Sequence, residues 1–230
     1  MATRATRSGS EIAPEQLCFA ENIVAKAGIL EDETANLLIS SFASVPRACF
    51  LDLNFRSRAL EDECFPVGFG QTSTAPSTVA RMLGLLGLRP KMRILEVGAG
   101  SGYCSAIMAA AGAHVFGVEC VGLLAQSTRK RLDALSYQNV IVKGGDGIRG
   151  WAEHAPYDGI IVWAAFEEYR KEIREQLTVP GGRLVAPLGN ALGQILTLWE
   201  AKATGVATYQ LEPSNFPEGK VTTLSAIKRG

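Results

Sequence analysis

Residues 94–103 read ILEVGAGSGY, and this stretch decides the fold. An apolar strand runs directly into Gly98, Gly100 and Gly102, and a helical stretch at about 103–112 follows. Glycine adopts backbone angles that other residues avoid, and it lets the chain approach a ligand closely. A loop of this kind, between a strand and a helix N-terminus, is where open α/β sheets bind ligands. The stretch therefore predicts an α/β fold with a binding site at the carboxyl end of this strand.

The same alternation of strand and helix continues along the chain. Short apolar strands are predicted at 92–97, 114–118, 139–143, 158–164 and 183–187, and helices at about 103–112, 122–135 and 167–177. Strands that are apolar throughout and alternate with helices indicate a parallel sheet covered on both faces. Further strands at 193–200, 205–211 and 220–227 predict an antiparallel edge. The fold class is a doubly wound, mostly parallel, Rossmann-like α/β sheet.

The residues before this core predict a helical cap. Apolar residues at helical spacing between Pro14 and Ser41 indicate two helices separated by a turn around Gly28, and Pro46 ends a helix. An irregular stretch at 52–66 leads to a hydroxyl-rich loop, GFGQTSTAPST at 68–78, before another helix. We expect one domain over 1–230, divided into a tail (1–13), a cap with the hydroxyl-rich loop (14–90), the α/β core (91–192) and C-terminal strands (193–230).

Composition excludes several classes of function. The 23 basic and 23 acidic residues cancel, which argues against a nucleic-acid-binding protein. No apolar run is long enough to span a membrane, so no membrane partner is expected. Five cysteines without metal-site spacing predict free thiols in a reducing cytoplasm. Two histidines leave little material for a metal site or a Ser-His-Asp set, so we expect no metal. We also expect a monomer.

Acidic residues stand at three successive strand ends. Glu96 precedes the glycines, Glu119 ends the next strand, and Asp146 lies between glycines after the third. Glu119 lies about 20 residues past the glycines, where a carboxylate can bind ribose hydroxyls; a solvated strand-end carboxylate is the alternative. A dinucleotide loop has a third glycine where Tyr103 stands. The order acidic-x-Gly-x-Gly-x-Gly instead resembles the S-adenosylmethionine (AdoMet) loop of class I methyltransferases.

Further motifs make the resemblance more specific. VPRACF, GFGQTSTAP, RILEVGAGSGY, GGDG, APYDGIIVWAA and PGGRLVAPLG occur in this order between about Glu21 and Gly189. Together they resemble the protein-L-isoaspartate O-methyltransferases. The resemblance implies AdoMet as cofactor, S-adenosylhomocysteine as product, and methyl esterification of the carboxylate of L-isoaspartyl residues in damaged proteins or peptides, a repair reaction.

The resemblance also implies roles for individual residues. The family loop reads Gly-Gln-Thr-Ile-Ser-x-Pro, so Ser73 stands at its isoleucine and Thr74 at its serine. Thr74 is the predicted catalytic residue and would orient the acceptor carboxylate. Glu96 would hold the amino-acid end of AdoMet, Glu119 the ribose, and Asp146 the adenine. The whole predicted cofactor set is Gln71, Thr72, Ser73, Thr74, Glu96, Gly98, Ala99, Gly100, Gly102, Tyr103, Glu119, Cys120, Gly145, Asp146 and Gly147.

Departures from the family pattern fall on the acceptor side. Trp163 and Phe166 would add bulk after the fourth strand, and Glu167 and Glu168 would add negative charge unless they face solvent. NFPEGKVTTL, from residue 215, replaces an aromatic-Val-Pro-Leu strand. Two alternatives therefore stay open: a related enzyme with another carboxylate or hydroxyl acceptor, such as peptide aspartate or a small molecule, and a non-catalytic AdoMet-binding adaptor. A nicotinamide oxidoreductase is disfavoured, because this sequence has neither the third glycine nor an acid/base residue for hydride transfer.

Overall fold

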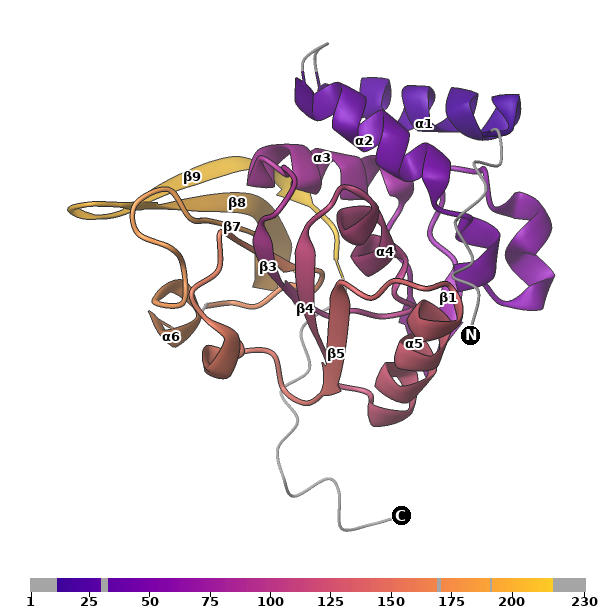
Figure 1. Cartoon of the computed structure of the whole chain (residues 1–230). Coiled ribbons are helices and arrows are strands. Elements are labelled where there is room, and N and C mark those ends of the chain that lie inside the picture. The colour runs from indigo at the N-terminus through magenta and orange to yellow at the C-terminus, as the bar shows by residue number, and fades with distance from the viewer. Residues whose placement is uncertain (1–11, 30–32, 169–170, 191, 217–230) are drawn as a thin grey trace, which may run out of the picture.

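A seven-stranded sheet forms the centre of the protein, in a computed structural model that describes residues 12–29, 33–168, 171–190 and 192–216. The strand order is β5-β4-β3-β6-β7-β8-β9 (Figure 1). The strands are β3 (Arg93–Val97), β4 (His114–Glu119), β5 (Val140–Gly144), β6 (Gly159–Val162), β7 (Arg183–Asn190), β8 (Gly193–Lys202) and β9 (Gly205–Ser214). Strands β3 to β7 are parallel, and β8 and β9 are antiparallel. This confirms the predicted fold class; the strand predicted at 220–227 lies outside the described residues.

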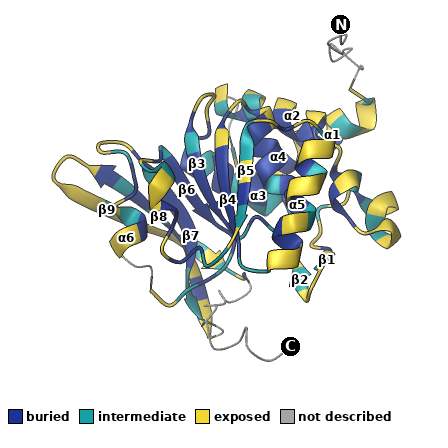
Figure 2. Cartoon of the chain, turned by 60° about the horizontal axis from the view of Figure 1, so that its bottom comes forward, coloured by how far each residue is buried: buried dark blue, intermediate teal, exposed yellow. Residues whose placement is uncertain are grey.

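One face of the sheet is covered by helices. Alternate strand residues, among them Ile94, Val115 and Ile161, pack there against α3 (Pro76–Leu86), α4 (Tyr103–Ala110) and α5 (Gly122–Ala134). Figure 2 shows this pattern as helices that are buried toward the sheet and exposed outward. The predicted N-terminal pair is confirmed as α1 (Pro14–Lys26) and α2 (Glu33–Ser44), which pack on one another and over α3 and α4 (Figure 1).

The opposite face is covered without long helices. Strand residues such as Leu95 and Phe116 pack against Trp151, Tyr157 and Leu177. This covering layer contains only the 3₁₀ helix η3 (Ala152–His154) and the one-turn helix α6 (Lys171–Arg174) among the described residues. The sheet is therefore covered on both faces, but unequally.

The helix predicted at 167–177 is wrong in extent, because extended pairing takes over at both of its ends. Phe166 forms a bridge with Leu188 of β7, and its carbonyl accepts the Gly189 N–H. At the other end, the Tyr157 N–H bonds to the Gln176 carbonyl at 2.8 Å. The Phe166 and Gln176 carbonyls therefore accept sheet-like hydrogen bonds, and between them only the one-turn helix α6 forms among the described residues.

Two 3₁₀ helices and a short hairpin connect α2 to α3, and the hydroxyl-rich loop overlaps the hairpin. Pro46 ends the run of α2, and the 3₁₀ helices η1 (Arg47–Phe50) and η2 (Leu53–Arg58) follow, so the stretch predicted as irregular is partly helical. The hairpin strands are β1 (Pro66–Gly68) and β2 (Gln71–Thr72). Helix α3 then starts at Pro76, whose fixed φ suits the first helical position.

Arg47 holds the segment that leads into this hairpin against the rest of the protein. Its guanidinium, on a residue only 3% exposed, donates to the carbonyls of Ala59, Glu61 and Glu63 at 2.5–3.2 Å. It also lies over the rings of Phe65 and Tyr103, at 5.1 and 5.6 Å from their centroids. Burial lowers the pKa of Arg47. A buried cation of this kind holds its surroundings in one arrangement, because any other would leave it without acceptors.

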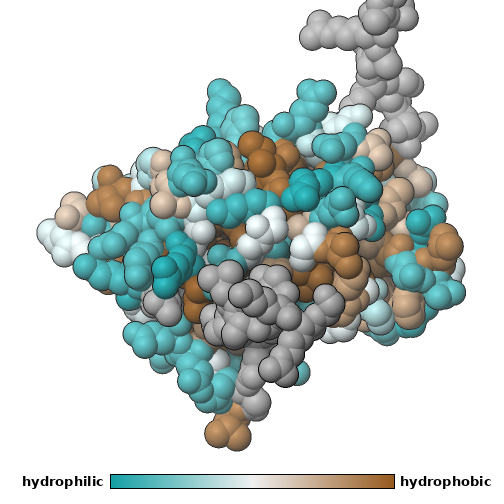
Figure 3. All heavy atoms as spheres, turned by 90° about the horizontal axis from the view of Figure 1, so that it is seen from below, coloured by the Kyte–Doolittle hydropathy of each residue, from teal (hydrophilic) through white to brown (hydrophobic). Residues whose placement is uncertain are grey.

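The surface shows no large hydrophobic face in the view from below, where hydrophobic residues form separate groups among hydrophilic ones (Figure 3). Within the described ranges, no helix is both long enough and apolar enough to cross a membrane.

Replacing Arg47 with methionine should lower the free energy of unfolding by about 3 kcal/mol, because three carbonyls lose a charged donor. Urea unfolding at pH 7 measures this loss. Arg58→Ala is the matched control: Arg58 also lies over Phe65, but its ion pairs with Glu61 and Glu63 are exposed. Arg58→Ala should cost much less than Arg47→Met, because solvent screens the exposed ion pairs of Arg58. Equal losses of unfolding free energy in the two variants would contradict the stabilising role of the buried Arg47 hydrogen bonds.

Candidate functional site

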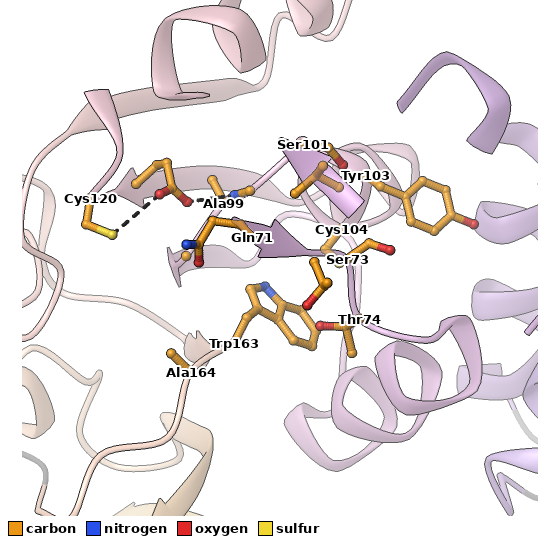
Figure 4. Close-up of a pocket in the computed structure, with 15 residues that line it drawn as sticks. Gln71, Ser73, Thr74, Ala99, Ser101, Tyr103, Cys104, Cys120, Trp163 and Ala164 are labelled. Atoms are coloured by element: carbon orange, nitrogen blue, oxygen red, sulfur yellow. Dashed lines mark hydrogen bonds between the residues drawn. The ribbon is translucent and has the colours of Figure 1, made fainter. Parts of the chain in front are cut away.

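A pocket lies at the carboxyl ends of β3, β4 and β6, with the hairpin and the loop after it on its other side (Figure 4). Parallel strands bring their carboxyl ends to one edge of the sheet, which is why the glycine loop and the strand ends meet here. The residues that line the pocket are Val67, Gln71, Thr72, Ser73, Thr74, Gly98, Ala99, Gly100, Ser101, Tyr103, Cys104, Glu119, Cys120, Trp163 and Ala164.

The glycine loop leaves space for a ligand at Gly100. This residue has φ +54°, and a Cβ placed on it would meet no heavy atom closer than the Gly98 carbonyl oxygen at 3.8 Å. Gly100 lines the pocket, so a side chain here would occupy the pocket rather than the core. The bare backbone therefore fits a ligand that lies directly against the loop.

Glu119 closes the glycine loop from the neighbouring strand. Its carboxylate accepts the N–H groups of Gly100 and Val121, each at 2.9 Å. The Cys120 thiol donates to the same carboxylate (Figure 4). Glu119 is 4% exposed and lines the pocket. Because a carboxylate has about four acceptor positions and these donors use three, one position remains for the predicted contact with a ribose hydroxyl.

Glu96 is placed differently from the sequence expectation. It is fully buried and lies behind the pocket wall rather than among the lining residues. Ser105 Oγ–H donates to one carboxylate oxygen, and Trp163 Nε1–H donates to the other at 2.9 Å. Burial raises the pKa of Glu96 to about 7; the two donors oppose the shift, and nearby Glu119 adds to it.

Two neighbouring residues of the hydroxyl-rich loop, Ser73 and Thr74, make different contacts. Ser73 pairs with Phe65: its N–H donates to the Phe65 carbonyl at 2.8 Å, and its Oγ accepts the Phe65 N–H at 2.9 Å. Thr74 lines the pocket and lies beside the Trp163 ring (Figure 4). A hydroxyl at position 73, where the family has isoleucine, therefore closes the loop through the Phe65 backbone.

The segment after β5 lies beside the pocket rather than in it. The Gly145 N–H donates to the Glu119 carbonyl at 2.9 Å, and Asp146 Oδ1 accepts the Ile148 N–H at 3.0 Å. Gly147 packs so closely on β3 that a Cβ would lie 2.5 Å from Val97 Cγ1. Three of the predicted residues thus form a turn that touches the backbone of Glu119.

The structure brings together most of the predicted set. Ten predicted residues line the pocket: Gln71, Thr72, Ser73, Thr74, Gly98, Ala99, Gly100, Tyr103, Glu119 and Cys120. Five do not line it: Glu96, Gly102, Gly145, Asp146 and Gly147. Contact of any of these fifteen residues with a cofactor stays a prediction.

Five residues that line the pocket are absent from the predicted cofactor set. Ser101 and Cys104 stand in and just after the glycine loop, and Ala164 follows a strand end, so all three carried a positional signal. Trp163 was predicted only to add bulk. Val67 had no signal, because the register of a three-residue hairpin strand cannot be inferred from sequence. On the acceptor side, Glu167 and Glu168 are exposed, in agreement with the solvent-facing alternative.

Comparison with known proteins identifies the family. The family model described as protein-L-isoaspartate(D-aspartate) O-methyltransferase matches residues 22–216. The chain belongs to this family. A protein-L-isoaspartate O-methyltransferase of Stenotrophomonas maltophilia (strain R551-3) is 43% identical over 193 residues, 83% of each chain. One of Salinibacter ruber is 41% identical over 182 residues, which cover 76% of this chain and 79% of the relative. The resemblance inferred from the motifs is confirmed.

Solved structures of the same family share the fold. One titled protein-L-isoaspartate O-methyltransferase has a TM-score of 0.78 and 27% identity, and covers 89% of this chain and 66% of that chain. A Plasmodium falciparum structure, titled as a putative member in complex with S-adenosyl-L-homocysteine, has a TM-score of 0.73 and 22% identity. It covers 89% of this chain and 98% of that chain.

The raised pKa of Glu96 predicts a pH-dependent stability. Folding favours the protonated carboxyl, so its contribution is fully present below pH 4.5 and is lost as the pH rises through about 7. Between pH 5 and pH 8, the free energy of unfolding of the wild type should fall by about 2 kcal/mol more than that of Glu96→Gln. Urea unfolding at both pH values measures the difference. Parallel profiles for the two proteins would contradict the assignment.

Proposed function

We propose that this protein transfers a methyl group from AdoMet to the side-chain carboxylate of L-isoaspartyl residues in proteins or peptides. The products are a methyl ester and S-adenosylhomocysteine, and the ester is the first step of repair. The observation that carries this proposal is one pocket lined by both Thr74 and a glycine loop that Glu119 closes, within a chain of this family.

The described residues fit AdoMet. The backbone at Gly100 leaves room for a ligand, and Glu119 presents a carboxylate to a ribose beside it. The proposed adenine contacts are Asp146 and Gly147; the bond between the N–H of neighbouring Gly145 and the Glu119 carbonyl supports them, because it joins their turn to the residue proposed for the ribose. Bound AdoMet supplies a methyl group on a positively charged sulfur, which a carboxylate oxygen can accept without proton transfer.

The protein's own contribution is therefore positioning. A carboxylate is already ionised near neutral pH, so the acceptor needs no general base, and no histidine lines the pocket. Thr74 donates its hydroxyl proton to one acceptor oxygen and leaves the other aimed at the methyl group. Gln71, Thr72 and Ser73 line the pocket next to Thr74. Correct alignment and exclusion of water can lower such a barrier by several kcal/mol, on the order of 7.

The remaining expectations concern the class of substrate, the cellular compartment and the oligomeric state. A formal net charge of zero supports a polypeptide substrate rather than nucleic acid. All five cysteines are free thiols, which supports a reducing cytoplasm. We take the protein to act as a monomer there.

Two matched peptides test the acceptor. The wild-type protein, incubated with AdoMet labelled on the methyl group, should transfer base-labile label to a peptide with L-isoaspartate. The same peptide with L-aspartate should receive at least about tenfold less, which is the ratio for 1.4 kcal/mol of discrimination. Equal labelling of both would identify a general carboxylate acceptor. Label on neither, with AdoMet bound in calorimetry, would favour another acceptor or an adaptor.

Thr74→Ala should lower kcat by about tenfold to a hundredfold, because the acceptor loses one oriented hydrogen bond to a charged group. AdoMet affinity, measured by calorimetry, should change less than about threefold on the same argument. Thr78→Ala is the matched control, because Thr78 lies in the first turn of α3 and outside the pocket. Undiminished turnover in Thr74→Ala would remove Thr74 from the catalytic role.

A further inference from the structure

Glu96 and Trp163 are 67 positions apart in sequence and meet behind the pocket. Glu96 is on β3, and Trp163 follows β6, the strand next to β3 in the sheet. The indole Nε1–H donates to Glu96 Oε1 at 2.9 Å, and Ser105 of α4 donates to Oε2. Each carboxylate oxygen thus already has a donor from the protein.

The Trp163 indole itself forms part of the pocket wall. The residue is 7% exposed and lines the pocket between the glycine loop and Thr74 (Figure 4). Its backbone N–H bonds to the Val97 carbonyl at 3.0 Å, which continues the pairing of β6 with β3. A Cβ on Gly98 would lie 3.5 Å from Trp163 Cβ. Backbone pairing and close packing fix the Trp163 backbone, and the bond to Glu96 is the polar contact that fixes the ring.

We propose that Glu96 is a positioning residue that acts through Trp163: it holds the indole in the pocket wall, and the indole, not Glu96, borders the site of methyl transfer. This inference rests on the proposed function. It replaces the sequence expectation of a direct contact between Glu96 and the cationic amino group of AdoMet.

Burial supports this role over direct contact. Glu96 is 0% exposed and outside the pocket lining, so a ligand's amino group would have to displace Ser105 or Trp163 to reach it. The titratable groups that face it are Glu119 and Cys104, and neither supplies a positive charge. With its pKa raised to about 7, the carboxyl is partly protonated at neutral pH. An oxygen of either form accepts the indole proton, so positioning does not require a full charge.

The indole has a clear task next to Thr74. A flat, rigid wall there excludes water and limits how the acceptor side chain can turn. Loss of its hydrogen bond should therefore reduce turnover more than cofactor affinity, as for Thr74, because alignment matters most in the transition state.

Four variants test the proposal. Trp163→Phe keeps an aromatic wall but removes the donor, and Glu96→Leu keeps the bulk but removes the acceptor. Each should lower kcat by about tenfold, and the double variant should fall within about twofold of either, because both remove one interaction. Glu96→Gln keeps an acceptor oxygen for the indole and should recover most of the loss seen in Glu96→Leu. Multiplicative losses in the double variant would overturn the proposal.

Binding separates this role from an ionic one. Under direct contact, Glu96→Gln would lose at least about tenfold in AdoMet affinity but none for 5′-methylthioadenosine, which lacks the amino group. Under the proposal, Glu96→Gln binds both ligands within about threefold of the wild type, a difference below 1 kcal/mol. Calorimetry with the two ligands measures this. A selective loss for AdoMet alone would overturn the proposal, whatever the acceptor is.

An indole signal tests the contact in the free protein. The Nε1–H proton resonance of Trp163, assigned by its loss in Trp163→Phe, should shift with pH with a midpoint near 7. It should stop titrating in Glu96→Gln. Trp151 provides an internal reference, because its Nε1–H donates to Glu153 instead. A Trp163 resonance with the same chemical shift in the wild type and in Glu96→Leu at every pH from 5 to 9 would overturn the proposal. Because this measurement needs no substrate, it fails or succeeds independently of the proposed function.

Discussion

The hydrogen bond from the Gly100 N–H to the Glu119 carboxylate is the contact on which the site depends. It ties the loop after β3 to the end of β4, while the Gly98 N–H bonds to the Val118 carbonyl. The Gly145 N–H adds the turn after β5 by bonding to the Glu119 carbonyl. Three loops are thus held at one edge of the sheet by backbone donors. Backbone groups buried at such an edge need partners, and this need stabilises the arrangement before any ligand arrives.

Arg47 stabilises the part of the site that lies outside the sheet, which is the hairpin and the loop after it. The hairpin that carries Gln71 to Thr74 has only short strands of its own, and a two-stranded hairpin is marginally stable alone. Arg47 holds the carbonyls of the preceding segment and stacks between Phe65 and Tyr103. Tyr103 starts α4 directly after the glycine loop, so one buried cation connects the cofactor side of the pocket with the acceptor side.

Much of the fold could be predicted because it depends on local pattern. Four of the five parallel strands and the helices α4 and α5 lie within two residues of their predicted bounds, since apolar strands and glycine boundaries leave few alternatives; β7 starts at the predicted residue but continues to Asn190. The helix predicted at 167–177 failed because bridges to Leu188 and Tyr157 took its backbone groups. Helical spacing carries no information on such distant partners. Likewise, the pattern around Glu96 predicted an acidic residue at the right strand end, but not the direction of its carboxylate.

The sequence alone determined the order of strand, glycine loop and helix, the family, and the hydroxyl of Thr74, because each of these is local in the chain. Only the tertiary structure decided that Glu96 faces Trp163, that Ser73 serves the Phe65 backbone, and that Val67 lines the pocket. These are contacts between separate segments, and packing selects them from several arrangements that the same sequence pattern allows. The residues that could bind a ligand were therefore readable from sequence, whereas the residues that shape its pocket were set by the fold.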